Sequence, residues 1–214
     1  MKQFFLVVAA AVFLSAGSKA QDLTNILFGI KAGYNLNFSS FITTKKVSSN
    51  PVHGGYAGVM MKIPFDNRLS FTPHLDLNYR GAETDVVEPS QYSSVKEFQM
   101  RVMPLLQIDF KHPDEKANSL FVHFGPSVEF GLKGKEVKQD AANMKQKGDL
   151  RYGYQRYGRY DASWHTGIGY ETTGGVRVLL EYAHGLGNMI NTENGGTIKY
   201  RSVSVGVGYW LGRK

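Results

Sequence analysis

Histidine lies two residues from aspartate or serine in two stretches of this 214-residue chain. Asp161, Ser163 and His165 share one face if their stretch is a β-strand, and so do His74 and Asp76. A carboxylate that orients a histidine, which in turn activates a serine, is the arrangement of an acyl hydrolase. The same side chains also serve as hydrogen-bonded filler in polar interiors. The elements that carry these residues therefore decide between the two interpretations.

Both stretches belong to segments in which apolar and polar residues alternate with a period of two, as in half-exposed β-strands. The last of these segments, residues 201–211, is apolar at every odd position from Val203 onward and small at every even position except Trp210. About ten residues is the length that a tilted strand needs to cross a bilayer. Eight such segments occur, at residues 28–38, 53–63, 69–80, 97–110, 120–130, 160–171, 176–182 and 201–211.

The connections between these segments alternate between long and short, with lengths of about 15, 5, 14, 8, 28, 4 and 14 residues. Membrane barrels have short periplasmic turns and longer extracellular loops. The sequence therefore predicts an all-β fold, an eight-stranded antiparallel up-and-down transmembrane β-barrel. A soluble periplasmic binder of the lipocalin kind is the alternative, but it gives no reason for loops to be sorted in this way.

The N-terminal residues have the composition of a secretory signal peptide. Lys2 precedes an apolar run over residues 4–14, and residues 18–20 form a small-x-small cleavage site. We expect residues 1–20 to be the signal peptide and residues 21–214 to be the barrel domain. The chain has no cysteine, which excludes a disulfide framework. Export without disulfides favours an envelope protein, located in the outer membrane of a Gram-negative cell.

Each predicted strand has one apolar face and one face that carries charges. The apolar faces hold too many aromatic side chains to fit inside an eight-stranded barrel, so we expect them to contact lipid. The polar faces then fill the lumen, where charges of both signs can pair. Ser163 and His165 fall in this interior, away from lipid substrates, so we predict no catalytic residues. The predicted lumen charge network consists of Lys31, Asp76, Arg80, Arg101, Asp109, Glu129, Glu171, Arg177 and Glu181.

The six histidines show no metal-ligand spacing, and neither a Gly-rich phosphate loop nor an RNA-binding aromatic motif occurs. We predict no metal site, no cofactor and no nucleic-acid partner. Trp210 is the one large side chain on the inward face of its strand, and we expect it at the periplasmic mouth, below the packed lumen.

A basic segment, residues 133–159, carries the excess positive charge of the mature chain. Within it, we predict a contact with lipopolysaccharide phosphates or another anionic partner through charge-assisted hydrogen bonds. The alternative is a solvated loop beside an ordinary aromatic girdle. By alternation, Tyr152, Tyr154 and Tyr160 should continue the lipid-facing side of the sixth strand. The predicted contact residues are Arg151, Tyr152, Tyr154, Arg156 and Arg159.

Four segments resemble the PorT-like outer-membrane barrel family, in their order and spacing. They are GIKAGYNLN (29–37), HFGPSVEFG (123–131), EYAHGLGNMI (181–190) and VGVGYWL (205–211). Glu181 stands where that family often has arginine. The resemblance implies an outer-membrane barrel of Gram-negative type, and the family's namesake is linked to protein secretion across the outer membrane.

We therefore expect a monomeric, non-enzymatic barrel with a structural, adaptor or surface-interaction role that supports protein secretion. Its expected partners are outer-membrane lipids, including lipopolysaccharide, and other envelope or secretion proteins. Two alternatives stay open: a lipid-modifying barrel enzyme, and a narrow conduit for small hydrophobic solutes.

Overall fold

The computed structural model describes residues 26–42, 47–86, 91–110, 118–139, 144–153, 157–189 and 197–211. The predicted signal peptide lies outside these ranges. Among the residues described, no helix is long and apolar enough to span a membrane. The strands are β1 (Leu27–Ile42), β2 (Val47–Asn50), β3 (Val52–Pro64), β4 (Leu69–Val86), β5 (Gln91–Asp109), β6 (Ser119–Gln139), β7 (Lys145–Asp149), β8 (Tyr160–Glu171), β9 (Val176–Gly185) and β10 (Thr197–Leu211).

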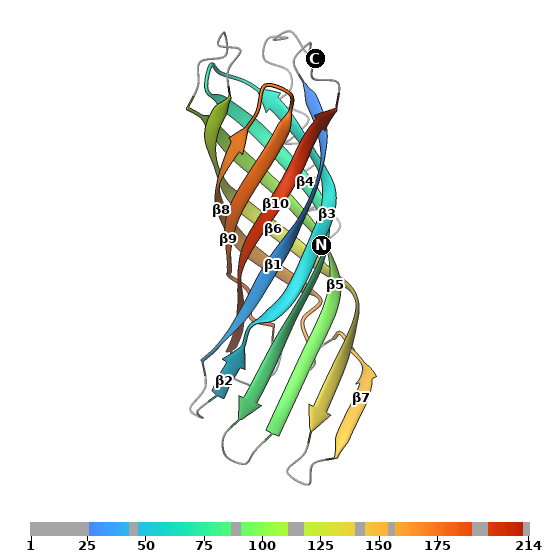
Figure 1. Ribbon diagram of the computed structural model, residues 1–214. Helices are drawn as coiled ribbons and strands as arrows, with labels where there is room; N and C mark the ends of the chain where they lie inside the picture. The colour runs from blue at the N-terminus through green and yellow to red at the C-terminus, as the bar shows by residue number, and fades with distance from the viewer. Residues whose placement is uncertain are drawn as a thin grey trace, which may run out of the picture.

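Eight of these strands form a closed antiparallel barrel, so the predicted fold is confirmed (Figure 1). The order around the wall is β4, β3, β1, β10, β9, β8, β6 and β5, and pairing of β4 with β5 closes the ring. The short strands β2 and β7 pair with β4 and β6 respectively, and they are not part of the eight-stranded wall. Phe28 lies opposite Leu211, so β1 begins and β10 ends at the same end of the barrel. The short connections 65–68 and 172–175 lie at that end, which we call the short-turn end.

Side chains alternate between the two sides of the wall as the sequence pattern predicts. On β10, Val203, Val205 and Val207 are exposed on the outside, whereas Ser204 and Trp210 are buried inside. Apolar side chains cover the outside of the other barrel strands as well, and buried polar side chains occupy the inside. This inside-out arrangement is the one a lipid environment requires, because lipid receives the apolar face and the lumen receives the charges.

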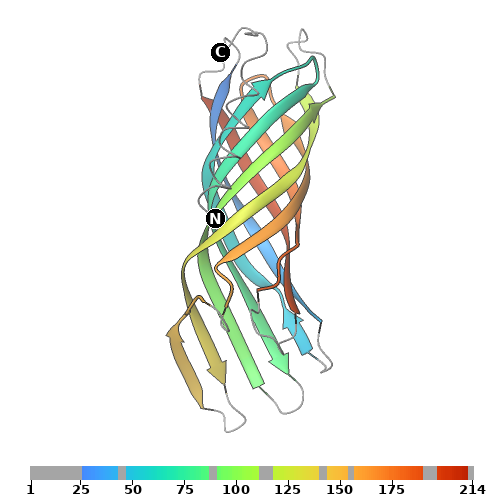
Figure 2. The same ribbon diagram turned by 180° about the vertical axis from the view of Figure 1, so that it is seen from behind.

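Three strands run far beyond their predicted ends, away from the short-turn end (Figure 2). β4 continues to Val86 and β5 begins at Gln91, so the predicted loop of about 14 residues is mostly strand. The segment predicted as a polar loop from residue 131 to 159 contains the second half of β6 and also β7. We call this extension, residues 81–86, 91–97, 132–139 and 145–149, the projecting sheet. Its strands were missed because a sheet outside the lipid needs no continuous apolar face.

Three prolines lie side by side on adjacent strands, near the middle of the barrel wall. Pro73 on β4 is opposite Pro104 on β5, and the flanking register places Pro126 on β6 opposite Pro104. The registered pairing between β5 and β6 is interrupted at this point. Proline has no backbone N–H, so two facing prolines leave the ladder without two of its donors. The β5–β6 seam is therefore a weak line in the wall.

Replacing Pro104 and Pro126 together with valine should restore both donors and raise the free energy of unfolding by about 1–3 kcal/mol, at 0.5–1.5 kcal/mol for each net hydrogen bond. Urea unfolding of the barrel in lipid vesicles, followed by tryptophan fluorescence, would measure this change. Pro64→Val, at the exposed end of β3, is the matched control and should leave stability unchanged. Lower stability of the double variant would contradict the missing-donor explanation.

Candidate functional site

The structure places all nine predicted network residues on the lumen side of the wall. Eight of them are buried, and Asp109, near the short-turn end, is half-buried. They form three groups along the barrel axis, and each group ties together strands that lie apart in the sequence. We describe these groups from the middle of the barrel outward.

The middle group joins β1, β4 and β5 through a shared carboxylate. Lys31 Nζ lies 3.0 Å from Asp76 Oδ2, and Arg101 Nη2 donates to the same oxygen at 2.9 Å. Lys31 Nζ also lies 2.9 Å from His74 Nδ1. Both cations stand beside the ring of Tyr56, at 5.0 and 5.4 Å from its centroid. Among the described residues, Asp76 is the acid that lies within ion-pair distance of both buried cations.

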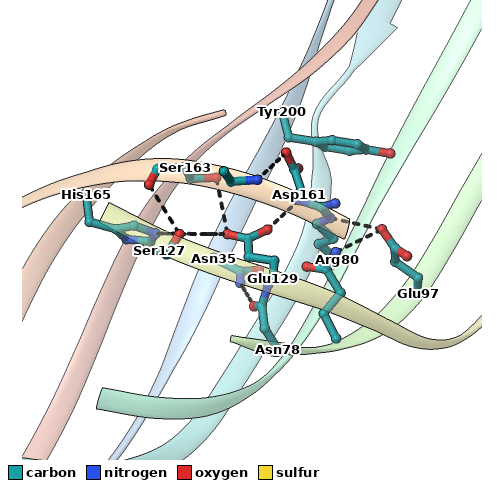
Figure 3. Close-up of polar contacts among 12 residues, drawn as sticks. Asn35, Asn78, Arg80, Glu97, Ser127, Glu129, Asp161, Ser163, His165 and Tyr200 are labelled. Carbon is teal, nitrogen blue, oxygen red and sulfur yellow. Dashed lines mark hydrogen bonds and ion pairs between the residues drawn. The ribbon is translucent and has the colours of Figure 1, made fainter. Parts of the chain in front are cut away.

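The outer group is centred on Arg80, which contacts three carboxylates from three other strands (Figure 3). Its Nε donates to Glu97 Oε1 at 3.0 Å, and its Nη1 donates to Glu129 Oε2 at 2.7 Å and to Asp161 Oδ2 at 2.9 Å. The guanidinium lies 4.1 Å from the centroid of the Tyr200 ring on β10. The Arg80 side chain therefore connects five strands of the barrel.

Glu97 was absent from the predicted network, although alternation would have placed it inside with Arg101. It was taken only as the first residue of its strand, beyond which no apolar face continues. In the structure it accepts hydrogen bonds from Arg80 and, at 3.1 Å, from Gln99 Nε2. Its place as a hub could have been found by extending the period-two pattern without requiring apolar partners.

The third group fills the lumen toward the short-turn end. Arg177 Nη2 donates to Gln107 Oε1 at 2.6 Å, and Arg177 Nε lies 3.4 Å from Glu171 Oε2. The Arg177 guanidinium stands 4.1 Å from the ring centroid of Phe121 and 4.8 Å from that of Trp210. Trp210 Nε1 donates to Glu171 Oε2 at 2.9 Å. Trp210 lies toward the short-turn end, as expected, but it is fully buried within the packed lumen instead of below it.

Asp109 takes its counter-charge from a residue that the sequence analysis did not single out. Lys62 Nζ lies 2.8 Å from Asp109 Oδ2 and 3.8 Å from Glu171 Oε2. Lys62 was overlooked because it lies next to the weakly alternating part of its strand.

Glu181 lies among histidines that were also not predicted as part of the network. Glu181 Oε1 is 3.6 Å from His123 Nε2 and 3.7 Å from His165 Nδ1. The search for groups of three or more possible metal ligands found none among the described residues. The histidines here fill space between ion pairs.

The candidate serine and histidine do not pair with each other (Figure 3). His165 Nε2 lies 3.0 Å from Ser127 Oγ, and Ser163 Oγ donates to Glu129 Oε1 at 3.2 Å. All four side chains are buried. Neighbouring positions on one face of a strand point in the same direction, so Ser163 and His165 each bond across to β6 instead.

The structure separates the predicted contact residues of the basic segment. Arg151 and Arg159 are exposed, whereas Tyr154 and Arg156 lie outside the described residues. Tyr160 is 68% exposed on the lipid-facing side, where it was predicted. Tyr152 was wrongly placed on that side: its hydroxyl donates to Glu97 Oε2 at 3.0 Å, inside the barrel. The alternation fails because the strand pairing stops between β7 and β8, and the chain turns inward there.

This inward turn covers the outer end of the lumen with Leu150, Tyr152 and Tyr157, which we call the tyrosine cap. Tyr157 Oη donates to Glu97 Oε1 at 3.1 Å and lies 2.5 Å from Tyr200 Oη. Burial, and then the Glu97 carboxylate, raise the pKa of Tyr152, so this hydroxyl stays protonated and donates. A cavity of about 10 Å³, room for about one water, lies below the cap between Arg80 and Arg101.

A closed eight-stranded barrel with an apolar outer face and a paired, charged lumen defines a β-barrel of the Gram-negative outer membrane. Comparison with protein families agrees with this class. Residues 19–191 match the family described as outer membrane protein beta-barrel domain, and the chain belongs to that family. The protein is therefore an outer-membrane protein.

Several solved structures are similar to this chain over most of its length. Ail, the attachment invasion locus protein of Yersinia pestis, solved with the heparin analogue sucrose octasulfate, is 13% identical with a TM-score of 0.46, over 87% of this chain and 99% of that chain. OprG from Pseudomonas aeruginosa is 9% identical with a TM-score of 0.48, over 86% and 95%. Neisserial surface protein A is 11% identical with a TM-score of 0.44, over 85% and 96%. The search of curated proteins found no match.

Replacing Asp76 with asparagine should destabilise the barrel by about 3–5 kcal/mol, because it leaves Lys31 and Arg101 buried without their shared counter-charge. Equilibrium unfolding by urea in lipid vesicles would measure the loss. Asp66→Asn, in the exposed turn between β3 and β4, removes the same charge and should change stability by less than about 0.5 kcal/mol. Similar losses in the two variants would show that the lumen pairing does not matter.

Proposed function

We propose that this protein is a closed, non-enzymatic barrel that acts as a structural adaptor at the cell surface. The observation that carries the proposal is the charge network, which crosses the lumen at three levels. Arg80 alone connects β4 to β5, β6 and β8. A solute that passed through would have to break buried ion pairs, which are costly to separate in a low-dielectric interior.

The closed lumen argues against the conduit that the sequence analysis left open. The tyrosine cap covers the lumen at the outer end, and Arg177 with Trp210 fills it toward the short-turn end. An eight-stranded barrel is only wide enough for its own inward side chains. Each level of this lumen is filled by side chains that bond to one another.

The lumen geometry also favours a non-enzymatic role over a lipid-modifying enzyme. His165 bonds to Ser127 and Ser163 bonds to Glu129, all in the buried interior. An enzyme that acts on lipids needs its nucleophile at the lipid-facing rim, within hydrogen-bond reach of its base. The one serine–histidine contact among the described residues, Ser127 with His165, is shut inside the wall.

The projecting sheet supplies the surface for an adaptor role. It lies at the end opposite the short turns, which faces the cell exterior in outer-membrane barrels. All five residues of β7 are exposed, among them Lys145 and Lys147. The resemblance to the PorT-like family suggests that the partners are components of a secretion machinery. We propose separately that the barrel itself is a monomer.

Purified wild-type barrel in planar bilayers should show no stepwise conductance, because the network leaves no water-filled path. Replacing Arg80, Glu97 and Glu129 together with alanine removes only the outer group and should leave the barrel closed as well, because the middle group and Arg177 with Trp210 still fill the lumen. Heat-modifiable gel mobility would confirm that the variant is folded. Discrete conductance steps in the wild type would contradict the closed barrel.

Affinity pull-down from intact envelopes tests the adaptor role. The wild type should recover other envelope proteins, and Lys145→Glu with Lys147→Glu on β7 should lose them. Arg68→Glu, in the exposed turn at the opposite end, is the matched control and should retain them. Recovery that is the same for all three proteins would exclude the projecting sheet as the contact surface.

A further inference from the structure

Four cations lie close together on the outside of the wall, just beyond the lipid-facing surface. On β5 and β6, Lys96 is directly opposite Lys135. The neighbouring pair of outward-facing residues, on the side nearer the lipid, is Phe98 with Lys133. Arg159, which precedes β8, adjoins the same patch: its Nε donates to Gly131 O at 3.3 Å. We call Lys96, Lys133, Lys135 and Arg159 the basic patch.

A β-bulge in β6 turns the two lysines outward. The register passes from Gln99 opposite Gly131 to Phe98 opposite Lys133, so Leu132 has no partner. Below the bulge, even-numbered residues of β6 such as Val128 face outward; beyond it, Lys133 and Lys135 do so. Bulges re-aim side chains in this way and are usually retained for a purpose. Without the extra residue, both ammonium groups would point toward the tyrosine cap.

The positive charge of the basic patch is largely uncompensated within the described chain. Lys96 Nζ lies 3.5 Å from Glu83 Oε1. Lys133, Lys135 and Arg159 form no ion pair with any acid among the described residues. Like charges directly opposite each other in a sheet are destabilising. Asp149 on β7 lies opposite Lys135, so two acids adjoin the four cations, and the remaining positive charge favours binding of an external anion.

The position of the patch indicates where that anion comes from. Phe98, Phe130 and Tyr160 form the aromatic edge of the lipid-facing surface on β5, β6 and β8. The Arg159 guanidinium lies 5.0 Å from the Phe130 ring centroid. Aromatic belts mark the level of the lipid headgroups. This edge lies at the end opposite the short turns, so the headgroups at its level are those of the outer leaflet.

We propose that the basic patch is a binding site for the phosphate groups of an outer-leaflet lipid, the kind of phosphate that lipid A carries. Lys133, Lys135 and Arg159 contact the phosphate oxygens through charge-assisted hydrogen bonds, while Phe98 and Phe130 contact the first carbons of the acyl chains. This deepens the proposed function, on which it rests, by naming a lipid partner for the membrane-proximal edge of the projecting sheet.

The projecting sheet offers a matched control. Lys145 on β7 is opposite Gln139, four residues beyond Lys135 along β6. At about 3.3 Å per residue, it lies roughly 13 Å further from the membrane. A proximal variant (Lys133→Gln, Lys135→Gln, Arg159→Gln) and a distal variant (Lys138→Gln, Lys145→Gln, Lys147→Gln) remove the same charge at different heights.

The test is binding of lipid A to each barrel in nanodiscs, with dephosphorylated lipid A as the second ligand. The wild type and the distal variant should prefer the phosphorylated lipid, and the proximal variant should bind it about ten-fold more weakly, at roughly 0.5 kcal/mol for each exposed contact. Heat-modifiable mobility checks that all three are folded. Equal loss in both variants, no loss in the proximal variant, or no preference for phosphate would each overturn the proposal.

Inorganic phosphate separates the lipid from a free anion. If it displaces lipid A at low millimolar concentration, the patch binds a soluble phosphate and the lipid site is wrong. Conductance and pull-down by the proximal variant should match the wild type, since neither depends on the basic patch. A failed lipid site would therefore leave the proposed adaptor function intact, and a failed adaptor function would show in those two measurements alone.

Discussion

The contact of Arg80 with three carboxylates is the interaction on which the closed lumen depends. Charges in a narrow barrel cannot reach water, so each must find its partner across the lumen. Arg80, Glu97, Glu129 and Asp161 come from four different strands and meet at one level. The wall must therefore have one register all the way round, because shifting any of these strands by one residue would move its charge to the lipid side.

Large inward side chains set a second condition, that neighbouring inward positions on nearby strands be glycine. A Cβ at Gly206 would lie 2.1 Å from Tyr56 Oη, and a Cβ at Gly29 would lie 2.7 Å from Trp210 Cε3. Similar contacts put Gly167 against His123. The glycines on the inward faces are therefore the counterparts of the rings that stack on the cations. The lumen is filled by paired charges and by rings seated on glycines together.

The sequence was sufficient to predict the membrane-spanning strands and the direction of their side chains. Lipid on one side of the wall and a charged lumen on the other impose a strict alternation of apolar and polar residues. The sequence was not sufficient where that contrast ends. The last residues of β6 (135–139) and all of β7 lie beyond the lipid and lack an apolar face, so their lysines and glutamines resemble a loop in the sequence. Tyr152 was misplaced because alternation was extended through residues 150–159, where the chain leaves the sheet.

The bulge at Leu132 explains why the same part of the chain defeats a simple alternation and yet organises both sides of the wall. Gly131 lies just before the bulge and Gly134 is moved to the inner face by the extra residue; a Cβ at these positions would lie 2.7 Å from Tyr152 and Leu150 respectively. The tyrosine cap can therefore pack against β6 only because these two positions are glycines. The same residue turns Lys133 and Lys135 outward at the edge of the aromatic belt. One insertion thus closes the lumen and creates the basic patch, which couples the closed interior to the charged exterior.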